Sequence, residues 1–159
     1  MELLVESQRQ FHIGGSFHNH RWDFASLVLL GNLRELVYSV SDHGEHYFHH
    51  RYYARGQKEH YDVDFFGEAI LACTGSRELS RGDVYCTPND ILHSIEVSGN
   101  TFAATLVLTC ENVKWETNDL YAPTPLAPTL DAIPSPSLPP EIAETKLKEL
   151  SSALGIQLS

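Results

Sequence analysis

The stretch that decides the fold is Ser16-Phe17-His18-Asn19-His20-Arg21-Trp22-Asp23-Phe24, which continues to a glycine at position 31. Its two histidines are two residues apart, and side chains on a β-strand alternate between the two faces with a period of two. His18 and His20 therefore project from the same face when this stretch is extended. Two imidazoles on one wall of a barrel are suited to hold a single metal ion.

A third histidine ends a second segment far along the chain, Gly82-Asp83-Val84-Tyr85-Cys86-Thr87-Pro88-Asn89-Asp90-Ile91-Leu92-His93. There a strand meets a Pro-Asn-Asp turn, and His93 follows the turn. The two segments together predict a three-histidine site made by His18, His20 and His93.

Length, composition and charge are typical of one soluble globular domain. The chain has 159 residues, of which 42% are hydrophobic and 20% charged, so it is long enough to bury a core. A formal net charge of -10 argues against nucleic acid or an anionic membrane as the main partner. We find no membrane-spanning run and no basic signal-peptide region. Three cysteines without CxxC spacing indicate free thiols, so we expect a cytoplasmic protein.

Most of the chain has the pattern of short strands separated by Gly, Asn and Asp turns. A strand is expected at 25–30, followed by a Gly-Asn turn. Further strands are expected at 33–40, 46–55, 61–66, 69–74, 83–86, 93–97 and 101–109. Many short strands at close spacing predict an all-β sandwich or barrel.

The composition changes after residue 121. Seven of the eight prolines lie in residues 122–140, which predicts an extended strap or linker. Residues 141–155 predict a helix, with Pro140 in the first turn and Gly155 as C-cap. Its apolar stripe consists of Ala143, Leu147, Leu150 and Leu154. The stripe needs to cover the barrel of its own chain or that of a second subunit, and the second arrangement would make a homodimer.

The two histidine segments resemble the two motifs of the cupin superfamily. The first motif, G(X)5HXH(X)3–4E(X)6G, is matched by His18, His20 and Gly31, with Phe24 where the family has its acidic ligand. The resemblance implies a cupin double-stranded β-helix, or jelly-roll barrel, with a metal inside the barrel mouth. It places the barrel at residues 1–121, including a short lead-in at 1–15.

The second motif, G(X)5PXG(X)2H(X)3N, is matched at full spacing by Gly82, Pro88 and His93. Asp90 stands in place of its glycine, and Val97 in place of its asparagine. Agreement at both motifs is more specific than an HXH alone in a chain with nine histidines.

Without the acidic ligand, the resemblance implies a three-histidine centre similar to that of the thiol (cysteine) dioxygenases. Asp23 is next to the acidic place, but strand parity puts it on the face opposite the histidines. Residues 31–35, Gly-Asn-Leu-Arg-Glu, also resemble the segment that follows the first motif in these enzymes. Their catalytic His and Tyr fall on Val107 and Thr109, and their crosslinked cysteine falls on Ala25. Cysteine itself is therefore a poor candidate substrate.

The resemblance implies a small cupin metalloenzyme. Fe(II) is the favoured ion because three protein ligands leave positions for a substrate and O₂, while Zn, Cu, Ni and Mn remain open. Oxygenation of a small organic substrate is favoured, and a metal-dependent lyase, isomerase or cyclase is the alternative. A competing hypothesis is a non-catalytic cupin that binds a small ligand, or a scaffold whose helical tail docks on a partner. A barrel that has lost its metal and keeps the histidines as core residues is the structural alternative.

Four further residues are candidate substrate contacts. Trp22 and Phe24 fall on the histidine face, with ordinary barrel packing as an equal alternative. Thr109 occupies the place of the catalytic tyrosine in the resembling enzymes. Arg51 would anchor a substrate carboxylate if it faces the pocket, and would otherwise be solvated.

The remaining polar residues of interest have less specific signals. Surface positions on loops and strands are expected for His43, His46, His49, His50 and His60. Cys86 is expected to be a buried structural thiol. Glu35 and Glu96 are candidate acid–base groups provided that parity or a bulge turns them inward.

Overall fold

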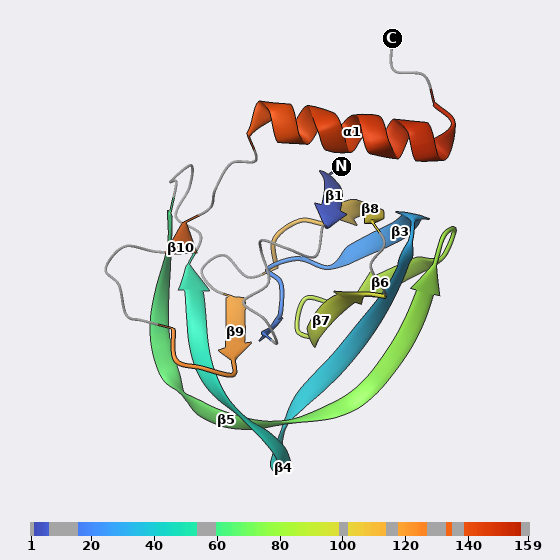
Figure 1. Ribbon diagram of the computed structural model, residues 1–159. Coiled ribbons are helices and arrows are strands. Elements are labelled where there is room, and N and C mark those ends of the chain that lie inside the picture. Colours follow the sequence, from blue (N-terminus) through green and yellow to red (C-terminus); the bar gives the residue numbers. More distant parts are fainter. Residues whose placement is uncertain are drawn as a thin grey trace.

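Two antiparallel β-sheets and one α-helix make up the described part of the chain (Figure 1). The computed structural model describes residues 2–6, 16–53, 60–98, 102–113, 118–126, 133–134 and 139–156. Within these ranges, no helix is long and apolar enough to cross a membrane. The remainder of the expected lead-in, residues 7–15, lies outside the described residues, as do residues 127–132 and 135–138 of the expected strap.

The strands of each sheet come largely from distant parts of the chain. The four-stranded sheet has the order β1 (Glu2–Glu6), β8 (Ala103–Thr109), β3 (Phe24–Leu30) and β6 (Val84–Thr87). The six-stranded sheet has the order β10 (Ile133–Pro134), β5 (His60–Ser80), β4 (Asn32–Tyr53), β7 (Leu92–Val97), β2 (Phe17–His18) and β9 (Asn118–Ala122). The predicted all-β class is thus confirmed, and the architecture is barrel-like.

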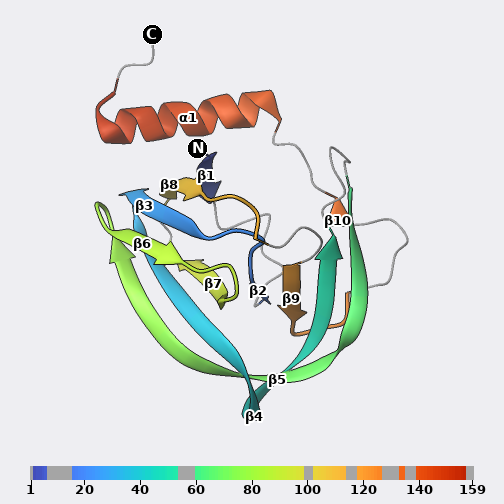
Figure 2. The ribbon, with the colours of Figure 1, turned by 180° about the vertical axis from the view of Figure 1, so that it is seen from behind.

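The long strands β4 and β5 form a curved hairpin that frames the six-stranded sheet (Figures 1 and 2). Residues 33–38 of β4 pair with β7, whereas residues 48–52 pair with β9. The two-residue strand β2 pairs with both β7 and β9. The ladder therefore closes through β4, β7, β2, β9 and back to β4. Closure removes free strand edges around β2, the strand that carries the first candidate ligand.

A bulge lets β4 change partners halfway along its length. Residues 41–44 are extra in the β4–β5 register, since Val40 and Glu45 both pair with Leu71. Bulges of this kind bend the strand that contains them. Gly44 lies in this bulge with φ +138°, and a Cβ there would come 2.1 Å from the carbonyl oxygen of Leu71. Only glycine fits this position without a shift of the neighbouring backbone.

Two expectations on strand length are wrong. The strands expected at 33–40 and 46–55 are joined in one strand, β4, with residues 54 and 55 outside the described residues, and those expected at 61–66 and 69–74 are joined in β5. The sequence at 41–44 has the composition of a turn, but its backbone stays in the hairpin as a bulge. Local turn chemistry therefore did not end the strand.

Substitution of Gly44 should lower the free energy of unfolding far more than substitution of Gly67, a glycine on β5 with a similar backbone conformation. Gly67 has a similar φ of +147° and also sits at a register shift, but nothing lies within 4 Å of its Cβ position. We expect Gly67→Ala to lose about 1–2 kcal/mol from backbone strain. Gly44→Ala should lose clearly more, because it adds a clash with Leu71. Urea denaturation of both variants measures this, and equal losses would contradict the close approach at Gly44.

The interior contains two clusters of buried hydrophobic side chains. The larger cluster consists of Phe24, Val28, Leu33, Leu79, Tyr85, Ala103 and Val107. The smaller one consists of Phe17, Tyr47, Leu71 and Tyr121. Phe17 and Phe24 flank the first histidine motif and belong to different clusters, so the motif is anchored in packed core at both ends.

The C-terminal helix α1 spans Pro140–Leu154 and lies outside the sheets, in contact with β3 (Figures 1 and 2). The expected C-cap is confirmed: Gly155 is left-handed with φ +70°, and its N–H donates to the carbonyl of Ser152 at 3.2 Å. The N–H of Ile156 donates to the carbonyl of Ser151 at 2.9 Å, which satisfies another terminal carbonyl. The helix therefore ends where the sequence predicts.

The apolar stripe of the helix is buried only in part. Leu150 is buried at 6% exposure, and Ala143 and Leu154 are half-buried. Leu147, at 44% exposure, lies on the surface, so its expected burial is wrong for the single chain. The face of the helix that contains Leu150 is therefore the most buried one, and Leu147, one turn earlier in the stripe, is exposed to solvent.

Two leucines of the helix provide a matched pair for testing this packing. Leu150→Ala should lower the free energy of unfolding by about 2 kcal/mol or more, because it removes buried methyl groups. Leu147→Ala should change it by less than about 0.5 kcal/mol. Denaturation curves at several protein concentrations decide the matter. Equal and concentration-dependent losses would instead show that a second subunit covers Leu147.

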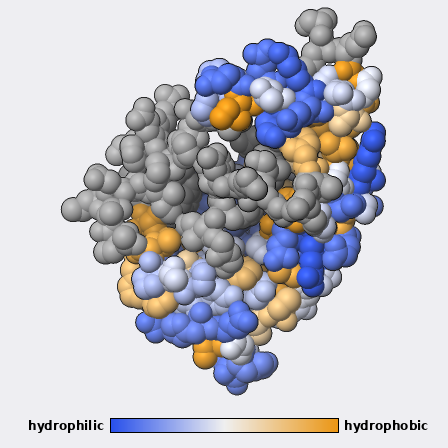
Figure 3. Space-filling view, in the orientation of Figure 1, coloured by the Kyte–Doolittle hydropathy of each residue, from blue (hydrophilic) through white to orange (hydrophobic). Residues whose placement is uncertain are grey.

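Large hydrophobic side chains also lie exposed on the strands. They include Val40, Phe65, Phe66, Ile70, Val84 and Leu108. On the face shown in Figure 3, hydrophobic side chains form separate patches between hydrophilic ones. Scattered exposure of this kind is ordinary in folded proteins.

Two further expectations about burial are wrong. Cys86 is exposed, because it lies on the outward face of β6. His50 is almost fully buried, at 1% exposure, and its Nε2 accepts a hydrogen bond from the backbone N–H of Leu126 at 3.4 Å. The segment after β9 therefore covers a position that strand composition alone places at the surface.

Candidate metal centre

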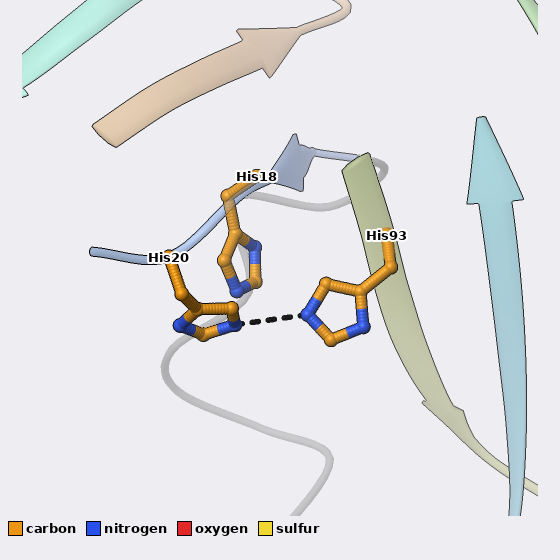
Figure 4. Close-up of side chains that lie close together, drawn as sticks. All are labelled: His18, His20 and His93. Carbon is orange, nitrogen blue, oxygen red and sulfur yellow. Dashed lines mark hydrogen bonds between the residues drawn. The ribbon is translucent and has the colours of Figure 1, made fainter. Parts of the chain in front are cut away.

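Three imidazoles, from β2, from the segment just after it and from β7, converge on one point (Figure 4). His18 is on β2, His20 follows two residues later, and His93 is the second residue of β7. His18 and His93 are direct partners in the β2–β7 ladder. One ring nitrogen of each histidine lies within 4.8 Å of the others. The structure thus brings together the three residues that the sequence singled out.

The spacing of the nitrogens fits a shared ion. Nε2 of His20 and Nε2 of His93 are 2.9 Å apart. Two imidazole nitrogens that each bind an ion at about 2.0–2.1 Å, at right angles, lie about 3 Å apart. Burial and then the neighbouring His93 lower the pKa of His20 to about 4. His20 is therefore neutral at pH 7, which is the form that binds a metal.

Asn19 fixes the middle of the first histidine motif to β9. Its Nδ2 donates to Oδ2 of Asp119 at 2.9 Å, and its Oδ1 accepts from the Asp119 backbone N–H at 2.8 Å. The Asn19 backbone N–H donates to the Asp119 carbonyl at 3.2 Å. Asp119 also faces Nε2 of His49 at 2.9 Å. These bonds hold both neighbouring histidines in a defined register.

Asp23 and Asn89 join the two motifs on the outside of the site. The Asp23 Oδ1 accepts from both the backbone N–H and the side-chain Nδ2 of Asn89, each at 2.7 Å. These bonds lower the pKa of Asp23. The Asn89 carbonyl accepts from the backbone N–H of His20 at 3.1 Å. Asp23 thus points away from the histidines, as strand parity indicated, and positions the His20 backbone.

Phe24 lies beside the histidines, at the place where the resembling family has its acidic ligand. Its ring centroid is 4.9 Å from that of His20 and 5.8 Å from that of His93. The ring is buried, and it packs with Tyr85 in the larger core cluster. Among the described residues, the candidate ligand set is therefore three imidazoles without a carboxylate.

A cavity of about 150 Å³ adjoins the histidines. Trp22, Phe24 and Thr109 line it, together with aliphatic side chains such as Leu33 and Val107. Its other hydroxyl groups come from Tyr85 and Thr105, and no Asp, Glu, Lys or Arg among the described residues lines it.

Arg51 does not line this cavity. Its guanidinium lies 3.7 Å from the ring centroid of Phe66, and its Nε is 3.6 Å from Oδ1 of Asp119. The position of Arg51 on β4 places it at the β9 side of the ring of strands. Three of the four candidate substrate contacts are therefore beside the histidines, and Arg51 is elsewhere.

Glu35 is the residue at the site whose position the sequence left open. It is almost fully buried, and its Oε1 lies 3.0 Å from Nδ1 of His93 and accepts from Oγ1 of Thr87 at 3.1 Å. Arg77 donates its Nε–H to Oε2. Burial raises the pKa of Glu35, but the bonds from His93 and Arg77 outweigh it and leave the pKa below its usual value. Strand parity was the signal that could have placed Glu35, because Glu35 is two residues from the core residue Leu33 and so faces the same side of β4.

Comparisons with protein-family models, with curated proteins and with solved structures found no match to this chain. An all-β fold with three converging histidines is compatible with a cupin. Membership of that family remains a prediction based on the two motifs.

Placing a carboxylate at Phe24 should strengthen metal binding. Without metal, Phe24→Glu should lower the melting temperature, because a buried carboxylate lacks a partner. Zn²⁺ should raise it again by more than in the wild-type protein, because the new side chain adds a ligand. Phe24→Leu, which adds none, should show the wild-type increase. Equal Zn²⁺-induced shifts in both variants would place the ion away from Phe24.

Proposed function

We propose that the protein is a small metalloenzyme in which His18, His20 and His93 bind one divalent transition-metal ion, with Fe(II) favoured. In this proposal it oxygenates a small organic substrate held in the adjoining cavity. The observation that carries the proposal is the convergence of three imidazole nitrogens, all within 4.8 Å of one another, beside a largely apolar cavity.

The ligand set favours chemistry in which substrate and O₂ meet at the same ion. Three neutral imidazoles suit Fe, Zn, Cu or Ni, and three protein ligands leave coordination positions open on an octahedral ion. When bound, a redox-active ion such as Fe(II) supplies the electrons that a reaction with O₂ requires. Zn²⁺ would instead act as a Lewis acid, which is the chemistry of the alternative lyase, isomerase or cyclase.

The residues of the cavity would exclude water and orient the substrate. Trp22 and Phe24 present apolar rings next to His20, with centroid separations of 6.0 and 4.9 Å. A site with few water molecules strengthens electrostatic interactions and suppresses side reactions. The hydroxyls of Thr105 and Thr109 are groups in the lining that can form hydrogen bonds to a substrate.

The part of the substrate that lies in the cavity without contacting the ion is expected to be uncharged. Burying a carboxylate without a partner costs several kcal/mol, and no described Arg or Lys lines the cavity. Arg51, the candidate carboxylate anchor, lies against Phe66 and Asp119 instead. The volume of about 150 Å³ corresponds to a group roughly the size of benzene.

The substrate class can be tested with two thiols that differ only by a carboxylate. Co(II)-loaded protein should bind propanethiol with a sulfur-to-cobalt absorption band, and mercaptopropionate at least about 10-fold more weakly, since 1.4 kcal/mol of unpaired charge already gives that factor. The triple variant His18→Ala, His20→Ala, His93→Ala serves as the control without a site. Tighter binding of mercaptopropionate would show that its carboxylate has a partner, either a cationic side chain or the cobalt ion itself, and the uncharged-substrate proposal would be wrong.

Oxygen chemistry needs its own measurement, for which nitric oxide can stand in for O₂. Fe(II)-loaded protein should give a paramagnetic resonance signal with nitric oxide that changes when propanethiol is added, because both molecules occupy one centre. If the thiol prevents nitric oxide from binding, the centre cannot hold both reactants. That result would favour the lyase, isomerase or cyclase alternative.

A further inference from the structure

We propose that Glu35 is a positioning residue for His93, fixing the imidazole with its proton on Nδ1 so that the Nε2 lone pair faces the other two histidines. The inference rests on the proposed metal site and adds to it a buried carboxylate behind one ligand. It depends on the hydrogen bonds around Glu35 and on the strand register that places it.

The β4–β7 register brings Glu35 to His93. Val37 is the direct partner of His93, and Glu35 is the partner of Ile95, so Glu35 is the diagonal neighbour of His93 on the same face. Its Oε1 lies 3.0 Å from Nδ1. Arg77 donates to Oε2 and Thr87 donates to Oε1, so both oxygens of Glu35 act as acceptors and the proton of the bond to His93 is assigned to Nδ1. An imidazole with its single N–H at Nδ1 has its lone pair on Nε2.

The other ring nitrogen of His93 points into the candidate metal centre. Its Nε2 is 2.9 Å from Nε2 of His20 (Figure 4). His93 is 2% exposed, so water cannot easily supply a substitute partner for Nδ1. A carboxylate on one nitrogen and a shared ion on the other is the arrangement that commonly orients metal-binding histidines in proteins.

Glu35 is itself held in place from two other strands. Arg77 on β5 donates to Oε2, and Thr87 at the end of β6 donates to Oε1 at 3.1 Å. The Arg77 guanidinium also lies 4.9 Å from the ring centroid of Tyr85 and donates to the carbonyl of Cys86 at 3.4 Å. The carboxylate therefore has partners on both oxygens, which a buried charge requires. Because Glu35 is fixed in this way, its hydrogen bond to Nδ1 also fixes the orientation of the His93 ring.

The decisive experiment compares Zn²⁺ affinity in wild-type protein, Glu35→Gln and Glu78→Gln, measured by competition with a chelating dye. Glu35→Gln keeps the size of the side chain, but its amide can donate to Nδ1 and favour the wrong tautomer. We expect its affinity to fall about 10–100-fold. Glu78 is exposed and pairs with Arg34 at 3.5 Å on the neighbouring strand, so Glu78→Gln should bind Zn²⁺ like the wild type.

A second measurement uses the wild-type protein and so does not depend on the folding of a variant. Two-bond proton–nitrogen correlation spectra of metal-free protein with labelled histidine should show His93 protonated on Nδ1, with the signal assigned by its loss in His93→Ala. In Glu35→Gln with an unchanged melting temperature, the spectrum should shift toward the Nε2-protonated form. A purely structural carboxylate would affect stability without changing the tautomer.

The possible outcomes separate the two proposals. If wild-type protein binds neither Zn²⁺ nor Fe(II), the proposed metal function is wrong. If wild-type protein binds Zn²⁺ and Glu35→Gln binds it equally well, only the role of Glu35 is overturned. An Nε2-protonated His93 in the wild-type protein would overturn that role as well, whatever the affinities.

Discussion

The site depends on one constraint, which is that the two-residue strand β2 is paired on both sides. β7 holds it through the His18–His93 pair, and β9 holds it through Phe17 and His18. A strand this short cannot define a position by itself, because each residue contributes few hydrogen bonds. Pairing on both sides, with Asn19 bonded to Asp119 just beyond the strand, turns a short segment into a rigid support for two imidazoles.

The closed ring of strands requires β4 to bend, and the bend is provided by the bulge at residues 41–44. One half of β4 carries Glu35 toward β7, and the other half reaches β9. The β4–β7 register in the half before the bulge places the carboxylate of Glu35 behind His93. Fold and site are connected in this protein because the one strand β4 both closes the ring of strands and carries Glu35.

The sequence predicted that three histidines lie close together because two spaced motifs contain them, although His20 lies just after β2 and not on the strand. Strand parity also placed Asp23 on the outer side, where it is bonded to Asn89. The lengths of β4 and β5 could not be predicted from the sequence, because a bulge that contains glycine and a turn have the same local composition. The burial of His50 depends on a segment more than 70 residues away, and no local pattern contains that information. Glu35 could be predicted only in part. Strand alternation indicates that its side chain faces the interior, but the sequence does not show that His93, Arg77 and Thr87 bond to it.

The three-histidine metal centre is tested most directly by metal analysis of the purified protein. Protein purified without a chelator and without a histidine tag should contain about one transition-metal ion per chain. The triple variant His18→Ala, His20→Ala, His93→Ala, purified in the same way and still folded, should contain none. A metal-free wild-type protein that also fails to take up added Fe(II) or Zn²⁺, or a triple variant with full metal content, would contradict the claim.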